Sequence, residues 1–177
     1  PESLLAYEIG FKSDYMHHKL RINGDAFWYD YHNQQMVGLA VIPRYGVVGQ
    51  YVNIPKSRIW GVEMELDANP IPGLVLQQHI GYERGNYKDF NAIDSTAVAL
   101  AYIKTGVLSA PYKNFNNVDR GIPKLPSEGS ASYKVKLGET WGLPPHVEYS
   151  YRGPRHNIPG NNLYRLPATV LLDTGIT

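Results

Sequence analysis

Three carboxylates on one short stretch are the residues of this sequence best suited to chemistry. Glu63, Glu65 and Asp67 alternate along "WGVEMELD" (60–67), so an extended backbone places all three on one side. Carboxylates in this arrangement suit acid–base catalysis or calcium binding. The simpler interpretation, which we favour, is a polar strand face whose charges are balanced by cations on other strands. The candidate cations are Arg21, Lys134 and Arg152.

Six histidines raise the question of a metal site. His17 and His18 are adjacent, and adjacent residues of an extended chain point in opposite directions. The sequence has no His-x-x-x-His spacing and no cysteine, so the usual zinc patterns are absent. We predict no metal and no cofactor, and without a nucleophile motif we predict that the chain is not an enzyme.

Composition sets the broad class of the protein. The 177 residues carry a formal net charge of +1, which gives no electrostatic reason to expect nucleic acid as a partner. Fourteen tyrosines make the chain too aromatic for a disordered segment. No apolar run approaches the ~20 residues of a membrane-spanning helix, whereas the strands of a membrane barrel are short and only half apolar.

The elements that must position the carboxylates are short strands, because large apolar and polar residues alternate in seven segments. One further segment, 95–110, fits either a short helix or an extra strand pair, and the structure of 91–120 is left open. The seven segments are 4–12, 20–31, 60–67, 74–83, 130–137, 146–152 and 164–176.

The links between these segments alternate in length, as they do in an antiparallel barrel with tight turns at one end and loops at the other. Links 13–19, 68–73 and 138–145 are short, 32–56 and 85–129 are long, and 153–163 is intermediate. We therefore predict an all-β, antiparallel meander that forms about seven strands of a larger, partial transmembrane β-barrel. A soluble β-sandwich that binds carbohydrate is the alternative, since its strands alternate as well.

In the barrel the apolar face meets lipid and the polar face meets the lumen. Aromatic residues near the strand ends favour this interpretation, because they resemble the belts at membrane interfaces. These aromatic residues are Trp28, Trp60, Tyr82, Tyr149 and Tyr151. The predicted lumen-facing residues are Glu8, Glu63, Glu65, Asp67, Lys134, Arg152 and Asp173.

Several segments resemble the carboxy-terminal barrel portion of a TonB-dependent outer-membrane receptor. "PESLLAYEIGFKSD" is similar to the family's Pro-Glu followed by a Tyr-Glu-x-Gly-x-Lys strand, and "LRINGDAFWYDYHNQQ" resembles its next strand. "RIWGVEMELDANPIPGLVLQQHIGY" resembles the family's Gly-x-Glu-x-Glu strand with its proline-containing turn. "GIPKLPSEGSASYKV" resembles the strand that follows Leu-Pro.

The resemblance implies a bacterial outer-membrane receptor with a 22-stranded barrel and an amino-terminal plug inside it. Such receptors import scarce nutrients such as ferric siderophores, energised by TonB through the plug. On this basis residues 1–177 are expected to be a single segment of the wall, a fragment without the plug. The partners expected are outer-membrane lipid, the TonB complex through the absent plug, and a siderophore-like small molecule.

The resemblance also places the ligand at the extracellular loops. Tyrosine rings and guanidinium groups suit an anionic, aromatic chelate. The loop residues expected to contact it are Arg44, Tyr45, Tyr51, Tyr112, Arg120, Arg155 and His156.

Overall fold

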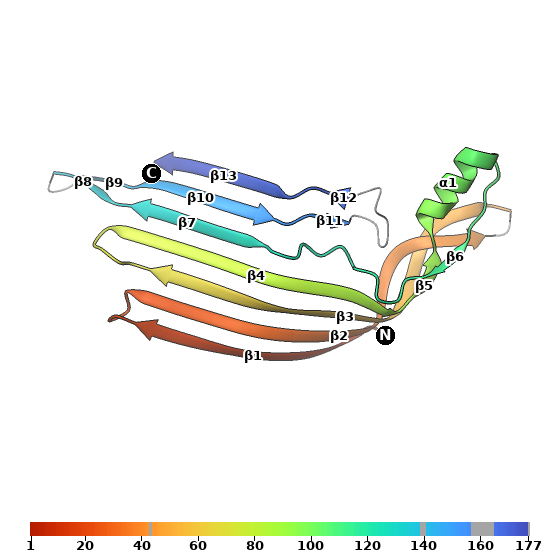
Figure 1. Cartoon of the computed structure of the whole chain (residues 1–177), viewed down its shortest axis with the longest axis horizontal. Helices are drawn as coiled ribbons and strands as arrows, with labels where there is room; N and C mark the ends of the chain where they lie inside the picture. The colour runs from red at the N-terminus through yellow and green to blue at the C-terminus, as the bar shows by residue number, and fades with distance from the viewer. Residues whose placement is uncertain (43, 139–140, 157–164, 177) are drawn as a thin grey trace.

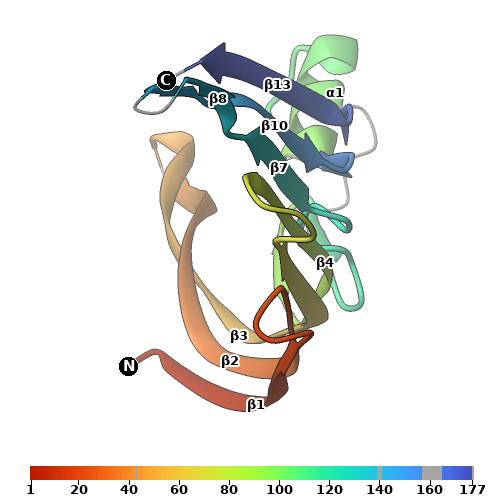
Figure 2. The same ribbon diagram turned by 90° about the vertical axis from the view of Figure 1, so that its left-hand side faces the viewer.

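The computed structural model describes residues 1–42, 44–138, 141–156 and 165–176. Its main element is a curved antiparallel sheet of seven strands in the order β1-β2-β3-β4-β7-β10-β13 (Figures 1 and 2). The strands are β1 (Ser3–Tyr15), β2 (Leu20–Ile42), β3 (Gly46–Ala68), β4 (Leu74–Asp89), β7 (Ser127–Tyr133), β10 (Pro145–Arg152) and β13 (Thr169–Ile176). The predicted seven-stranded meander is confirmed. In the described part of the chain the sheet does not close, since β1 and β13 each pair on one side only.

Smaller elements lie at the two ends of the sheet. They are β5 (Asn91–Ile93), α1 (Ser95–Thr105), β6 (Tyr112–Asn114), β8 (Val135–Leu137), β9 (Trp141–Leu143), β11 (Arg155–His156) and β12 (Arg165–Leu166). β5 pairs with β6, β8 with β9, and β11 with β12. In the described residues no helix is long or apolar enough to cross a membrane.

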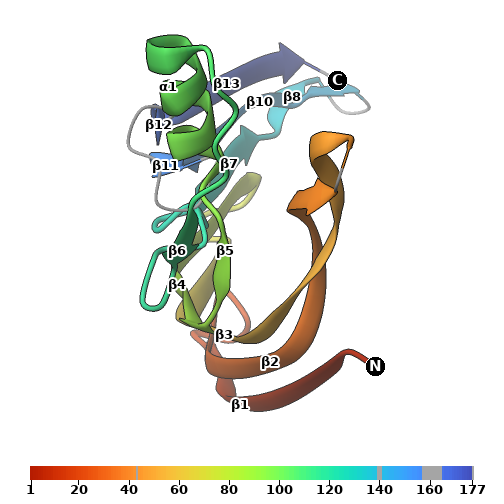
Figure 3. The same cartoon turned by 90° about the vertical axis from the view of Figure 1, so that its right-hand side faces the viewer.

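Short turns and long excursions lie at opposite ends of the sheet, which we call the turn end and the loop end (Figure 1). At the turn end, Met16, His17 and His18 all adopt positive φ angles in the tight β1–β2 turn. This left-handed run reverses the chain within four residues, 16–19. The β8–β9 hairpin lies at the same end, and α1 lies at the other (Figures 1 and 3).

The prediction of a long loop at 32–56 is wrong, because β2 and β3 continue through this segment as one hairpin. Their register is the same from Leu20↔Ala68 to Ile42↔Gly46, and within it Asn33 and Pro55 are unpaired. Residues 36–42 and 46–54 are rich in β-branched and other apolar side chains, which favour strands. They do not alternate with polar residues, so the period-two pattern that identified the other strands is absent there.

Other predicted boundaries also move. In the segment 95–110, left open between helix and strands, Ser95–Thr105 form α1. Asp94 caps its first turn by accepting from the backbone N–H groups of Thr96 and Ala97, and Gly106 ends it with φ 68°. The strand predicted at 130–137 ends at Tyr133, so Lys134 lies outside the sheet wall, beside the β8–β9 hairpin.

The final predicted strand, 164–176, is also too long at its start. In the structure β13 begins at Thr169. Arg165 and Leu166 instead form β12, which pairs with β11 away from the main sheet.

Strand register separates two faces of the sheet. Ile9, Ala26, Val62 and Tyr82 lie side by side across four strands on the apolar face. Ile9 is 77% exposed and Leu172 is 67% exposed, so no second sheet covers this face in the described chain. A sandwich would bury these residues, and the structure therefore does not favour the soluble alternative.

Aromatic side chains border the apolar face at both ends. Tyr7, Trp28 and Trp60 are aligned across β1, β2 and β3 toward the loop end, and we call them with Tyr82 the aromatic belt. Tyr15 and Tyr133 lie toward the turn end. The stretch of β3 from Trp60 to Ala68 has the length, about 9–11 residues, with which a tilted strand crosses a bilayer.

A small hydrophobic core lies at the loop end rather than under the sheet. Ile54, Tyr87, Phe90 and Phe115 are nearly fully buried, and the ring of Phe90 makes tilted contacts with those of Tyr87 and Phe115. This core attaches the segment 115–118 to β3 and β4.

Candidate functional site

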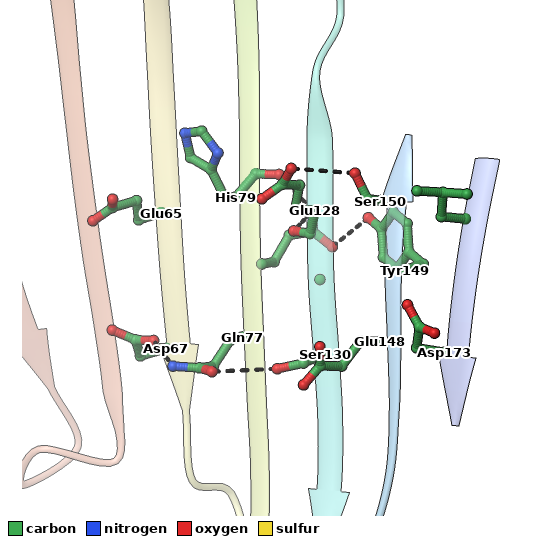
Figure 4. A pocket seen from close by; sticks show the side chains of 13 residues that line it. Glu65, Asp67, Gln77, His79, Glu128, Ser130, Glu148, Tyr149, Ser150 and Asp173 are labelled. Carbon is green, nitrogen blue, oxygen red and sulfur yellow. Dashed lines mark hydrogen bonds between the residues drawn. The ribbon is translucent and has the colours of Figure 1, made fainter. Parts of the chain in front are cut away.

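An open hollow of about 500 Å³ lies on the polar face across β3, β4, β7, β10 and β13 (Figure 4). Register explains its lining, because one row joins Asp67, Gln77, Ser130, Glu148 and Asp173 across these five strands. A second row joins Glu65, His79, Glu128 and Ser150. We call the five carboxylates of these rows and His79 the acidic hollow. Its members are Glu65, Asp67, Glu128, Glu148, Asp173 and His79.

Neutral hydrogen-bond donors, rather than cations, contact three of the five carboxylates of the acidic hollow. Asp67 accepts from Gln77 Nε2 at 3.1 Å, and Glu128 accepts from Ser150 Oγ at 3.2 Å (Figure 4). Asn23 Nδ2 donates to Glu65 at 3.2 Å. These carboxylates therefore lie on an open surface with neutral groups as their hydrogen-bond partners.

The expected pairing of Glu63, Glu65 and Asp67 with cations of other strands is wrong. Arg21 Nε instead donates to Asp14 at 3.1 Å. In the described chain neither lysine nor arginine forms an ion pair with the three carboxylates, and the imidazole of His79 lies 3.9 Å from Glu63. Arg152 lies at the end of β10 that is nearer the loop end, too far along the strand to pair with the three carboxylates.

The remaining predicted lumen-facing residues are distributed along the polar face. Glu8 lies on β1 and accepts a hydrogen bond from the Tyr29 hydroxyl. Glu8 and Glu63 both line a second hollow nearer the loop end. Within the described ranges no three His, Asp or Glu side chains gather in the manner of metal ligands.

The predicted ligand-contacting tyrosines are among the most exposed aromatic residues of the chain. Tyr45 is 80% exposed at the β2–β3 tip, Tyr51 is 75% exposed on β3, and Tyr112 is 72% exposed on β6. Arg44 lies beside Tyr45 with a φ of 72°. Such exposure leaves the rings free to stack on a ligand.

Arg120 differs from these residues because it is half-buried and fixed by several contacts. Its guanidinium donates to Gln34 Oε1 at 2.7 Å and to Ser57 Oγ at 3.1 Å. The rings of Tyr31 and Tyr87 both lie 5.7 Å from it. Ser57 is fully buried. We call these five residues the Arg120 junction.

The Arg120 junction fixes the segment after the hydrophobic core onto β2, β3 and β4. The backbone N–H of Arg120 also donates to Gly85 O at 2.9 Å. Tyr87 lies beyond the aromatic belt, and burial raises the pKa of its hydroxyl although Arg120 opposes that rise. Tyr87 therefore remains neutral, and the positive charge of Arg120 is stabilised by ring faces and hydrogen bonds rather than by a carboxylate.

Arg155 and His156 lie near the same segment. They line a cavity of about 250 Å³ together with Asp119, Ile122 and Lys124. A side chain at Gly121, whose φ is 83°, would collide with the backbone oxygen of His156. Glycine is therefore required where the 119–124 segment meets β11.

Several residues of these sites were not predicted from the sequence. Glu128 was missed because the strand was expected to begin at residue 130, and Glu148 because its strand carried no carboxylate cluster. Gln34 lay in the expected loop 32–56, and Ser57 lay between that loop and the strand expected at 60–67. One sequence feature could have indicated this site. Asn33, directly before two glutamines, is a residue type that tolerates a positive φ, and its φ is 54°.

An unclosed antiparallel sheet with an exposed apolar face, two aromatic borders and a charged inner face defines a segment of a membrane β-barrel wall. The family model described as "TonB dependent receptor-like, beta-barrel" matches residues 1–177. The chain belongs to this family. Its members are transport receptors rather than enzymes.

Solved structures show the same fold. The ferric yersiniabactin uptake receptor FyuA from Yersinia pestis superposes with a TM-score of 0.68 at 15% identity, over 99% of this chain and 22% of that one. A variant of the ferric enterobactin receptor PfeA from Pseudomonas aeruginosa gives 0.58 at 15% identity, over 99% and 23%. A second PfeA variant gives 0.59 at 16% identity, over the same shares. The chain thus spans less than a quarter of the length of these receptors.

Proposed function

We propose that this chain forms part of the wall of a bacterial outer-membrane receptor that imports a scarce nutrient, with energy delivered by TonB through a plug domain. The exposed apolar face of the open sheet carries this proposal, because only lipid makes such a face favourable. The family membership and the fold neighbours support it. The chain is one segment, and the plug belongs to the remainder of the receptor.

The proposed cargo is an anionic, aromatic ferric chelate of the siderophore type. The exposed rings of Tyr45, Tyr51 and Tyr112 at the loop end offer stacking surfaces, and Arg44 and Arg155 offer guanidinium groups. Two of the structural neighbours are named as receptors for ferric yersiniabactin and ferric enterobactin.

The acidic hollow is the proposed plug-facing surface. It lies toward the turn end of the polar face, away from the exposed tyrosines, and its carboxylates have no cationic partner in the described chain. Uncompensated carboxylates on an inner face call for water or for the basic side chains of an enclosed domain. The plug is the domain that this family encloses.

We expect the full-length parent protein to fractionate with the outer membrane, to require detergent, and to be necessary for uptake of at least one ferric chelate. The measurement compares iron-starved cells with and without the parent gene, using a panel of radiolabelled ferric chelates. A complemented strain is the control. Recovery of the parent as a soluble monomer, or unchanged uptake of every chelate by the deletion strain, would contradict the proposal.

A further inference from the structure

The lysine and arginine residues of the apolar face all lie at its loop end. Among the described residues in register on this face, these cations are Arg84, Arg58 and Lys56, at or beyond the aromatic belt. From Val62 to Ala68 and from Leu74 to Tyr82 the same face carries none. Charge is costly in the lipid-facing middle of a barrel but is tolerated near the interface.

Arg84 forms no ion pair in the described structure, and neither does Lys56, whereas Arg58 does. Arg84 Nε donates to the Tyr82 hydroxyl at 2.7 Å, and the Arg84 guanidinium lies 5.8 Å from the Tyr82 ring centre. Trp60 is its cross-strand partner in register and contacts Tyr82 edge-on at 5.9 Å. The guanidinium is thus held in place by aromatic residues, while both of its Nη groups remain available as donors.

Arg58 and Lys56 have closer acidic neighbours. Arg58 binds Asp30 through two hydrogen bonds of 2.8 and 3.2 Å and lies 4.2 Å from the Trp28 ring centre. Lys56 is opposite Asp89 in register, although the two form no ion pair. Asp30 therefore offsets the charge of Arg58, and Arg84 is the cation that is held beside the belt residues Trp60 and Tyr82 without an ion pair.

We propose that Arg84, with Trp60 and Tyr82, binds the phosphate group of a lipid in the leaflet at the loop end of the barrel. A pre-positioned guanidinium with free Nη donors matches the geometry of a phosphate. The aromatic rings lie at the depth where headgroups meet acyl chains. This inference rests on the proposed membrane location and concerns the outside of the wall, not the cargo.

The test uses the purified full-length parent in detergent and native mass spectrometry. The probes are a phosphatidic acid, which carries a phosphate monoester, and a phosphatidylcholine of the same acyl chains. We expect tighter binding of phosphatidic acid to the wild type. Arg84→Gln should weaken that binding about five-fold, the effect of one basic side chain near an anionic surface. Arg84→Lys should retain most of it.

Arg21→Gln is the matched control. It removes the same type of charge from the polar face at the turn end, where Arg21 is paired with Asp14, and should leave lipid binding unchanged. Inorganic phosphate should not displace the lipid, because the acyl chains supply part of the affinity. Equal binding by wild type and Arg84→Gln, or displacement by inorganic phosphate alone, would overturn the proposal.

Chelate uptake by the wild-type parent provides the separate readout of the proposed function. If the parent imports a ferric chelate but does not prefer phosphatidic acid over phosphatidylcholine, only the Arg84 site is refuted. A parent that is soluble without detergent refutes the membrane location itself.

Discussion

Replacing Met64 by arginine in the full-length receptor should lower the free energy of unfolding by about 2–4 kcal/mol, the cost of a cation on the lipid face near the bilayer midplane. Met64 lies on the apolar face about midway between the aromatic belt at Trp60 and the turn end at Ala68, and it is 44% exposed. Its cross-strand neighbours in register are Gly24 and Ile80. Arginine there exchanges contact with lipid for a charge in hydrocarbon.

The adjacent substitution Glu65→Arg is the matched control, because it introduces the same side chain one residue away on the opposite face. Glu65 lies in the acidic hollow, so an arginine there reduces the repulsion among carboxylates. We expect a much smaller loss, or a gain, in unfolding titrations in lipid vesicles. A larger loss for Glu65→Arg than for Met64→Arg would show that the two faces are inverted.

Removing the guanidinium of Arg120 should loosen the loop end. Arg120→Met keeps an unbranched side chain but leaves the buried Ser57 hydroxyl and the Gln34 amide without their charged donor. Hydrogen bonds to charged groups contribute about 1.5–3 kcal/mol. The loss should raise amide hydrogen exchange in residues 115–121 by roughly ten- to a hundred-fold, because about 1.4 kcal/mol corresponds to a factor of ten in an opening equilibrium.

Lys113→Met is the control, because it removes a positive charge from the same long connection between β4 and β7. Lys113 forms a partly exposed ion pair with Asp94 at 3.4 Å, and such pairs contribute less than about 1 kcal/mol. Arg120→Lys should rescue poorly, because a single ammonium does not reproduce the guanidinium fork. Unchanged exchange in Arg120→Met, or an equal increase in Lys113→Met, would contradict a positioning role for Arg120.

The strand wall could be predicted because one physical signal determines it. Where one face meets lipid and the other a polar interior, as from Trp60 to Asp67, the sequence alternates and the register follows. The β2–β3 extension could not be predicted in this way. Residues such as Val37, Val41 and Tyr51 lie beyond the belt, where neither face is uniformly lipid or water, so their pattern has no period of two.

The candidate sites depend on contacts between segments distant in the chain, and single-sequence patterns do not report these. Arg120 meets Gln34 across 86 positions of sequence. Glu128 and Glu65 share one row only because β4 and β7 pair in the observed register. The sequence indicated only that Arg120 is a cation in a loop. Its contact with the buried Ser57 could be known only from the fold.

The facing of the strands is tested most directly by labelling single cysteines along β3. This chain has no cysteine, so substitutions at Val62, Glu63, Met64 and Glu65 each introduce one unique label within it. The full-length receptor, with any other cysteines removed, carries a fluorophore at each site in lipid vesicles. We predict that a lipid-chain quencher quenches labels at 62 and 64 strongly and labels at 63 and 65 weakly. Equal quenching at all four sites, or the reverse alternation, would contradict the assignment of this chain to a membrane barrel wall.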